Sequence, residues 1–349
     1  MEKRKYGIDI LKIIATLFVV VLHVNGYVLD THVSFSESVN FIWHMFEALA
    51  YPAIHIFIMI TAWFALDKVN IKKSVLNAWI QTFIICIIGL IFSTCFKITY
   101  GLNEIIICIF PFLGRAYWYV TDFIVLIVIA PFLNNSIKAS TDKQLKLITL
   151  FTFMIISVFQ TFIPFFSWTQ DYSNIGLFIL LYFITACIKR DISIVKRIRG
   201  YKLFFISFVL LILSYEIFHI AGLLNFEVFK SREMWFYQYS SPLVIFEALG
   251  LFKMFVNMDI QTNEVNSKII KIMSNASLTT YLIHMHPIFI SHYVDWGILK
   301  FVDIQNMLIY IIEMLLLVVI IFVIGIIFSI PIIAIIKRIL NRSKGEYNV

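Results

Sequence analysis

The sequence predicts an all-α protein that crosses a membrane about ten times, with its helices around a polar cavity, and three observations predict this fold. Of the 349 residues, 61% are hydrophobic and only 14% are charged, whereas about a quarter of the residues in a soluble domain are charged. The mean hydropathy is +0.91. Apolar stretches of roughly 20 residues, long enough for a bilayer core of about 30 Å, recur along the whole chain. No polar stretch is long enough to form a separate soluble core.

Ten stretches have the composition expected of membrane-spanning helices. They are 8–29, 41–66, 74–96, 117–136, 146–166, 174–188, 203–222, 241–257, 275–294 and 304–336. In the second, Pro52 predicts a kink. The segment 103–114 is too short to cross, and Pro111 and Gly114 interrupt it, so we expect a re-entrant or interfacial piece there.

The basic residues predict the orientation of the chain. With ten spans, both termini lie on one side of the membrane. That side receives 22 of the 28 Lys and Arg residues, the opposite side receives five, and Lys12 lies inside the first span. Because cytoplasmic loops carry the excess of Lys and Arg, we expect both termini in the cytoplasm. This bias and anionic lipid account for the net charge of +7, so no nucleic-acid partner is implied.

The four cysteines do not form a recognisable motif. Cys86, Cys95, Cys108 and Cys187 lie in apolar segments at unrelated spacings. They predict neither a disulfide framework nor a metal site, and small buried hydrophobic side chains are the simpler interpretation. No G-x-S-x-G or Walker motif is present, so a serine nucleophile is not expected.

The first span carries a stripe of polar side chains. At 100° per residue, Thr16 and Lys12 fall within about 20° of His23, and Asp9 and Tyr27 fall about 40° from it. Lipid would leave such a stripe unsatisfied, so it is expected to face protein or water. Imidazole is the side chain best suited to take a proton from a hydroxyl near neutral pH. The alternative is a histidine that a neighbouring helix satisfies, with a packing role only.

Four segments together resemble the acyltransferase-3 family of integral membrane acyltransferases. Asp9, Lys12 and His23 resemble its first motif, D-x-x-K/R followed eleven residues later by His. The stretch IFIMITAWF at 56–64 resembles its second-span signature. The other two matches are WYVTDFIVLIVIAPFLN at 118–134, with its Trp and Pro at the family's spacing, and SLTTYLIHMHP at 277–287, which resembles S-x-x-x-Y-L-x-H.

The sequence departs from the family pattern at several positions, and the pattern looks more like the surface-polysaccharide O-acetyltransferase branch. The basic residue of the first motif is usually an arginine, and a lysine cannot make the same bidentate contact. The departures are Lys12 for Arg, Thr61-Ala62 for Ser-Gly, His55 for Asp or Pro, and Phe123 for Glu, with Asp122 before it.

The resemblance implies one membrane acyltransferase domain over 1–349, located in the cell membrane. It implies transfer of an acyl group, usually acetyl from acetyl-CoA, to a hydroxyl of a cell-surface polysaccharide or lipid-linked sugar. The family's essential first-span histidine corresponds to His23, which would act as general base or carry the acyl group transiently. Asp9 would anchor Lys12 or help to orient the donor. The resemblance also favours His284 as a hydrogen-bonding member of the site.

Further polar residues are candidates for substrate contacts, each with a simpler alternative. The lysines after the second span are candidates for the CoA phosphates, or are ordinary cytoplasmic charge. The polar residues of the second span are candidates for the acceptor site, or form an interhelical hydrogen-bond cluster. An arginine beside a tryptophan at the start of the fourth span would hold an anionic sugar or the developing oxyanion, or both residues belong to an aromatic belt. These candidates are Lys68, Lys72, Lys73; His44, Glu47, His55; and Arg115, Trp118.

Two other classes of function stay open at this point. A transporter or flippase that moves a glycan or an acyl group without forming a bond also needs intramembrane polar residues. Against it, the sequence has no inverted repeat. The departures in the motifs also allow an inactive member of the family with a scaffolding role.

Overall fold

The computed structural model describes residues 4–32, 34–112, 117–163, 175–192, 196–224, 226, 229, 232–292 and 300–345. Helices are the only regular secondary structure among these residues. The helices are α1 (Tyr6–Thr31), α2 (Glu37–Ala50), α3 (Ala53–Ala65), α4 (Ile71–Cys95), α5 (Leu102–Ile109), α6 (Trp118–Ala139), α7 (Asp142–Phe153), α8 (Gln160–Phe162), α9 (Ile175–Lys189), α11 (Gly200–Leu223), α13 (Pro242–Val256), α14 (Glu264–Asn275), α15 (Ser277–His284), α16 (Pro287–His292) and α17 (Met307–Gly345), with a π-helical turn, η1 (Met154–Phe159), between α7 and α8.

Within the described residues, seven helical segments are long and apolar enough to cross a membrane. They are α1, α2 with α3, α4, α6, the segment from α7 to α8, α11 and α17. The other three predicted spans correspond to shorter helices, namely α9, α13 and the pair α15–α16. The chain is therefore an all-helical, multi-pass membrane protein, while the count of ten crossings stays a prediction.

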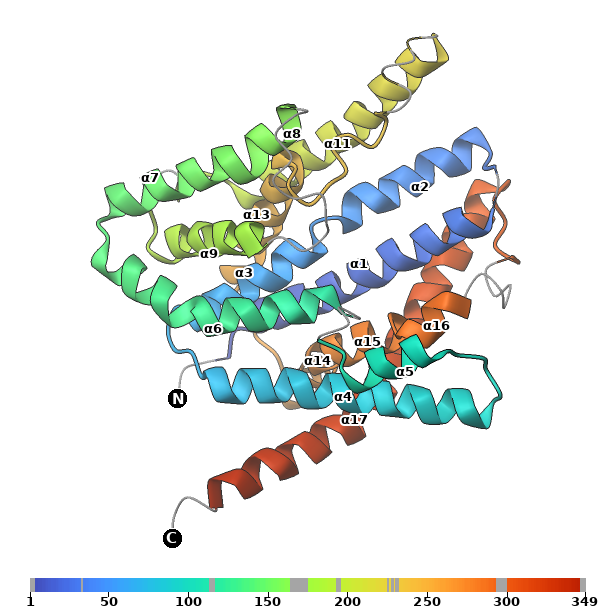
Figure 1. Cartoon of the computed structure of the whole chain (residues 1–349). Coiled ribbons are helices and arrows are strands. Elements are labelled where there is room, and N and C mark those ends of the chain that lie inside the picture. Colours follow the sequence, from blue (N-terminus) through green and yellow to red (C-terminus); the bar gives the residue numbers. More distant parts are fainter. Residues whose placement is uncertain are drawn as a thin grey trace.

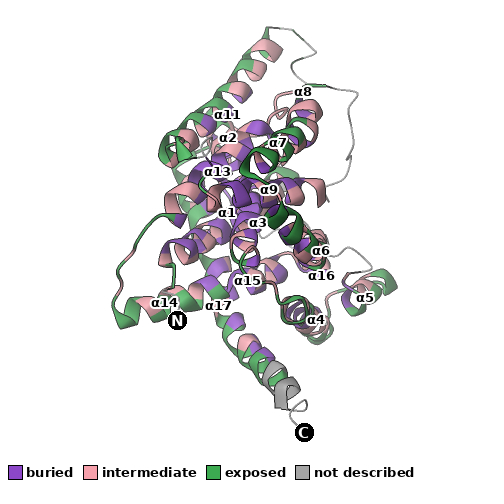
Figure 2. Ribbon diagram, turned by 90° about the vertical axis from the view of Figure 1, so that its left-hand side faces the viewer, coloured by how far each residue is buried: buried purple, intermediate pink, exposed green. Residues whose placement is uncertain are grey.

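Helix α1 lies at the centre of the bundle (Figure 1). It packs against α2, α3, α13, α14, α15 and α17. Leu11, Ala15 and Val20 on α1 are fully buried, whereas α17 exposes a series of Leu, Ile, Val and Phe side chains. Figure 2 shows the same division, with buried residues concentrated on α1, α3 and α9 and exposed ones on α4, α11 and α17. Because the exposed side chains are apolar, these outer surfaces suit contact with lipid tails.

Proline interrupts two of the predicted spans. In the second, α2 ends at Ala50 and α3 begins at Ala53, with Pro52 as its N-cap, so the predicted kink is confirmed. The span predicted over 275–294 is wrong as one continuous helix, because it divides into α15 and α16 at Met285 and His286. The cause is Pro287, which disfavours helical backbone in the residue before it and donates no backbone hydrogen bond.

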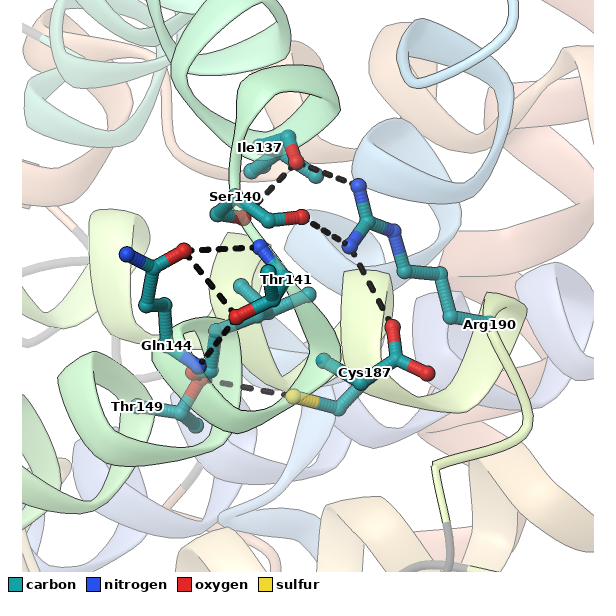
Figure 3. A network of polar contacts seen from close by, with 9 residues as sticks. Ile137, Ser140, Thr141, Gln144, Thr149, Cys187 and Arg190 are labelled. Carbon is teal, nitrogen blue, oxygen red and sulfur yellow. Dashed lines mark hydrogen bonds and ion pairs between the residues drawn. The ribbon is translucent and has the colours of Figure 1, made fainter.

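The loop between α6 and α7 is fixed by a network of polar contacts, drawn in Figure 3. The guanidinium of Arg190, just after α9, donates to the carbonyl oxygens of Ile137 and Ser140. Thr141 and Gln144 form a capping box, in which the Gln144 N–H donates to Thr141 Oγ1 at 3.2 Å and the Thr141 N–H donates to Gln144 Oε1 at 2.9 Å. Arg190 thereby donates to carbonyls at the end of α6, where the helix itself offers few donors.

Candidate active site

A cavity of about 530 Å³ runs along one face of α1. Its walls come from α1, α3, α4, α6, α14, α15 and α17 and from Tyr239, which precedes α13. Near the start of α1 its lining is polar and charged, with Asp9, Lys12, Ser74, Asn77, Ser274 and Lys337. Farther along α1 its lining is mainly aromatic, with His23, Trp118, Tyr119, Tyr239, Tyr281 and His284.

The polar stripe predicted on the first span faces this cavity. Asp9, Lys12, Thr16 and His23 all line it. Thr16 Oγ1 also donates to the Lys12 carbonyl at 2.8 Å and is hydrogen-bonded to Ser277 Oγ on α15 at 2.7 Å. Tyr27 lies beyond the cavity, and its hydroxyl contacts Met285 Sδ at 3.4 Å. The sequence predicts that this stripe faces protein or water and not lipid, and these residues do line a cavity or contact another segment of the protein.

His23 belongs to a chain of hydrogen bonds that links α1 to α15. Its Nδ1 lies 2.9 Å from His284 Nε2, and His284 Nδ1 lies 2.6 Å from the Thr280 carbonyl oxygen. The His284 ring is 4% exposed, so it is buried between the two partners. Thr280 and His284 are four residues apart on one helix, and this spacing brings the ring beneath the carbonyl.

This geometry determines which ring nitrogens carry hydrogen. A carbonyl oxygen only accepts, so His284 Nδ1 donates to Thr280 and carries the proton of the neutral ring. His284 Nε2 then accepts, and the donor to it is His23 Nδ1–H. In a neutral His23 ring the remaining nitrogen, Nε2, therefore keeps its lone pair. A histidine held in this tautomer is prepared to accept a proton at Nε2.

The aromatic side chains around His23 come from three other segments. The Tyr281 ring centroid lies 6.4 Å from that of His23 and 5.9 Å from that of Tyr119. Trp118 and Tyr239 have their ring centroids 6.0 Å apart. All of these side chains line the cavity. This end of the cavity is thus a mainly apolar enclosure with a few polar groups, which is typical of small-molecule sites.

The opposite end of the cavity has an excess of positive charge. Arg4 donates to both carboxylate oxygens of Asp9, at 2.6 and 2.9 Å, and Ser274 Oγ donates to the same carboxylate at 3.0 Å. The Asp9 charge is therefore matched by Arg4. Within the described part of the chain, Lys12 and Lys337 form no ion pair, and both line the cavity. Two ammonium groups at one cavity end favour an anionic ligand.

Comparison with models of known protein families shows to which family the chain belongs. The acyltransferase domain of the acyltransferase-3 family matches residues 5–335. The chain belongs to the acyltransferase-3 family. The resemblance seen in the four motifs is thereby confirmed at the level of the family, and acyl transfer is the class of reaction that this family supports. No curated protein matches the chain. No solved structure matches it either.

The structure brings together residues from all four motifs of this acyltransferase-3 chain. Asp9, Lys12 and His23 come from the first motif, Thr61 from the second, and Trp118 from the third. The fourth contributes Ser277, Tyr281 and His284. The motifs are separated by long stretches of sequence, and α1 is in contact with α3 and α15, which carry the second and the fourth.

The polar residues predicted on the second span lie away from the cavity. His44 Nδ1 is bonded to the Asn40 carbonyl at 2.8 Å, and its ring stacks on Tyr215. Glu47 Oε1 accepts from Asn25 Nδ2 at 2.7 Å. His55 is fully buried, and its Nε2–H donates to the carbonyl of Tyr239 at 2.7 Å. None of the three is among the lining residues, although His55 supports one of them.

Only some of the residues predicted to contact the donor and the acceptor line the cavity. Lys68 in the loop before α4 and Lys72 and Lys73 in its first turn are exposed and do not line the cavity, while Ser74 and Asn77 farther along α4 do. Arg115 lies outside the described residues. Lys337 also lines the cavity, whereas in the sequence it is only one of the 22 basic residues predicted on the cytoplasmic side, because its place at the cavity depends on how α17 packs.

Proposed function

We propose that this acyltransferase transfers an acyl group, most simply acetyl, from cytoplasmic acyl-CoA to a hydroxyl of a cell-surface polysaccharide or lipid-linked sugar. The observation that carries the proposal is the hydrogen-bonded chain from His23 through His284 to the Thr280 carbonyl. It leaves a basic nitrogen at the aromatic end of the cavity, far from the cationic end. The two ends suit the two substrates of such a reaction, an anionic thioester and a neutral hydroxyl.

The reaction follows from the tautomer of His23. Its Nε2 takes the proton of the acceptor hydroxyl while the hydroxyl oxygen attacks the thioester carbonyl carbon. The carbon–sulfur bond then breaks, and the departing CoA thiolate takes the same proton from Nε2. While His23 is positively charged, its Nδ1–H donates to His284 Nε2, which disperses the charge toward Thr280. A transient acyl group on His23 Nε2 would use the same lone pair, so direct transfer and an acyl-histidine both fit the geometry.

The cationic end of the cavity supports the choice of donor. Lys12 and Lys337 project into one space that also has hydroxyl and amide groups from α4 and α14. Ammonium groups bind phosphate oxygens through charge-assisted hydrogen bonds, and the CoA portion of the donor brings several phosphates. Asp9 lies about 21 Å from His23 along the helix axis. We therefore propose that Asp9 positions the inner end of α1 and does not touch the reacting atoms.

Transfer of label from acetyl-CoA tests the proposal. Purified protein in nanodiscs, given labelled acetyl-CoA and a polysaccharide acceptor, is expected to label the acceptor. His23→Ala is expected to lower the rate by about 10²- to 10⁴-fold, the contribution of a general base. His219→Ala on α11 is the matched control, because His219 does not line the cavity and its variant should keep the wild-type rate.

Three results would contradict the proposal or refine it. Label transfer that survives His23→Ala in a folded variant would exclude His23 as the base. Movement of a labelled sugar across vesicles without acylation would replace acyl transfer by transport. Ping-pong kinetics with a trapped acyl-histidine would select the covalent route, whereas formation of a ternary complex would select direct transfer.

A further inference from the structure

A second cluster of reactive side chains lies outside the cavity lining. Cys86 on α4, Cys108 on α5 and His286 in the break between α15 and α16 are brought together, although long stretches of sequence separate them. Each offers one ligand atom, and these three atoms all lie within 4.8 Å of one another. Cys108 Sγ is 3.9 Å from His286 Nε2. The two cysteines are fully buried, and His286 is 1% exposed.

The fold makes specific room for this cluster. A Cβ atom on Gly89, one turn after Cys86 on α4, would overlap the His286 ring, so the helix surface admits the ring only because residue 89 is glycine. Around the cluster lie buried apolar side chains, among them Ile85, Leu282 and Ile288. Two thiols and an imidazole thus converge in an apolar setting, where burial of polar groups without a partner is costly.

The ligand set matches a thiophilic metal ion. Thiolate sulfur and imidazole nitrogen bind Zn²⁺ at about 2.3 and 2.0 Å, which places neighbouring ligand atoms roughly 3.5 to 3.8 Å apart. The separation of 3.9 Å between Cys108 Sγ and His286 Nε2 is close to this range. Two thiolates also balance the charge of a divalent cation, which matters in an apolar interior. A cuprous ion would leave the same ligands with a net negative charge.

We propose that Cys86, Cys108 and His286 bind one Zn²⁺ ion that joins α4, α5 and the break between α15 and α16. Binding releases one proton from each thiol, forms two zinc–sulfur bonds and one bond to His286 Nε2, and leaves the fourth position to a water molecule. The ring proton of His286 then resides on Nδ1. The metal bond thereby replaces two contacts of the His286 ring. One is the long contact of 3.3 Å from the Ile288 N–H to Nδ1, and the other is the contact of Nε2 with Cys108.

The position of the cluster indicates a structural role. His286 lies two residues after His284, and the Leu282 carbonyl accepts a hydrogen bond of 2.9 Å from the Tyr117 hydroxyl. A metal ion at His286 would fix the end of α15 against α4 and α5, and so hold His284 in place without touching a substrate. The spacing of the cysteines in the sequence does not reveal such a site, because the third ligand comes from a distant helix break.

Metal analysis of the purified protein tests the site without any assay of acyl transfer. Protein purified without chelators is expected to contain about one zinc ion per chain, as measured by inductively coupled plasma mass spectrometry. Cys86→Ala, Cys108→Ala and His286→Ala should each lower this content by about tenfold or more, because loss of an outer-shell partner already weakens metal binding about 10- to 100-fold and loss of a direct ligand should weaken it at least as much. Cys187→Ala, at a buried cysteine on α9 that contacts Thr149, should leave the content unchanged.

Cobalt substitution keeps the proposal testable where a variant does not fold. Wild-type protein loaded with Co²⁺ should show the intense near-ultraviolet absorption of thiolate-to-cobalt charge transfer. Absence of metal from wild type, or zinc retained by all three variants, would overturn the site. A disulfide between Cys86 and Cys108 in the native protein would also overturn it, and copper at one per chain would overturn the assignment to zinc.

Discussion

The contact between His23 and His284 gives the sharpest residue-level prediction. Because His284 Nε2 accepts the Nδ1 proton of His23, its loss should free the His23 ring to adopt the wrong tautomer or rotate. We expect His284→Ala to lower kcat by about 10²-fold, with little change in the KM for acyl-CoA. His284→Gln keeps an accepting oxygen and should recover most of the rate. The pH profile of kcat is the readout.

A purely structural His284 would give a different result. In that case the Ala and Gln variants would lose activity in proportion to their loss of thermal stability, and the shape of the pH profile would stay that of the wild type. A low-pH limb that moves in the Ala variant and returns toward wild type in the Gln variant is specific to positioning of the base.

Lys337 provides a second prediction at the level of single residues. It lines the cationic end of the cavity together with Lys12. We expect Lys337→Gln to raise the KM for acetyl-CoA by about tenfold, equivalent to about 1.4 kcal/mol of donor binding, with kcat little changed. Lys337→Arg keeps the charge and should restore the affinity. Steady-state kinetics and CoA titration measure both.

The control for Lys337 is a lysine outside the lining. Lys68→Gln removes an exposed charge in the loop before α4 and should leave the KM unchanged. Acetyl-pantetheine, which lacks the nucleotide phosphates of the donor, should bind the wild type and Lys337→Gln equally. A variant that weakens both donors to the same extent would mean that Lys337 shapes the cavity and does not bind phosphate.

At the level of elements, α17 supports the helix that holds His284. A Cβ atom on Gly325 would lie only 2.8 Å from the backbone Cα of Thr280, whose carbonyl anchors His284. Gly325→Ala should therefore push α15 and α17 apart, with a cost of about 1–3 kcal/mol and a lower kcat. Thermal unfolding and label transfer measure the two effects.

Gly26→Ala is a matched control, because both glycines lie inside long helices. A Cβ atom on Gly26 would meet nothing within 4 Å. Since alanine favours a helix over glycine by about 0.8–1 kcal/mol, this variant should be slightly more stable than the wild type and fully active. Equal behaviour of the two variants would exclude the packing of Gly325 against Thr280 as a constraint on the site.

The sequence predicted these elements well where its signals were local. Hydropathy placed the helices, Pro52 located the division between α2 and α3, and the period of 3.6 residues put the stripe of α1 on one face. The break at His286 was missed because apolar residues continue across it, although Pro287 was visible. The roles of Lys337, Gly325 and the Cys86–Cys108–His286 cluster depend on contacts between distant helices, which no local pattern encodes.

At the level of the whole molecule, the number of crossings determines where the two ends lie. Seven crossings would leave the ends on opposite faces, whereas the start of α1 and the end of α17 lie on the same side in Figure 1. The shorter elements α9, α13 and α15–α16 supply three further crossings if each traverses the bilayer. They are relatively short, but neighbours surround them, as the buried Leu180, Phe252 and Leu282 show. A helix enclosed by protein needs less lipid-facing length than one at the periphery.

Reporter fusions test this topology of ten crossings. With cytoplasmic termini, a fluorescent reporter that folds only in the cytoplasm should be bright when fused after Gly345. A phosphatase reporter that is active only outside the cytoplasm should be active when it is fused at Tyr100, in the loop between α4 and α5. The excess of Lys and Arg on the inner side is the physical basis of this orientation. An active phosphatase at the C-terminal fusion would place the C-terminus outside, and with a cytoplasmic N-terminus the number of crossings would then be odd. It would also place Lys337 on the outer side, so acyl-CoA could not reach it from the cytoplasm.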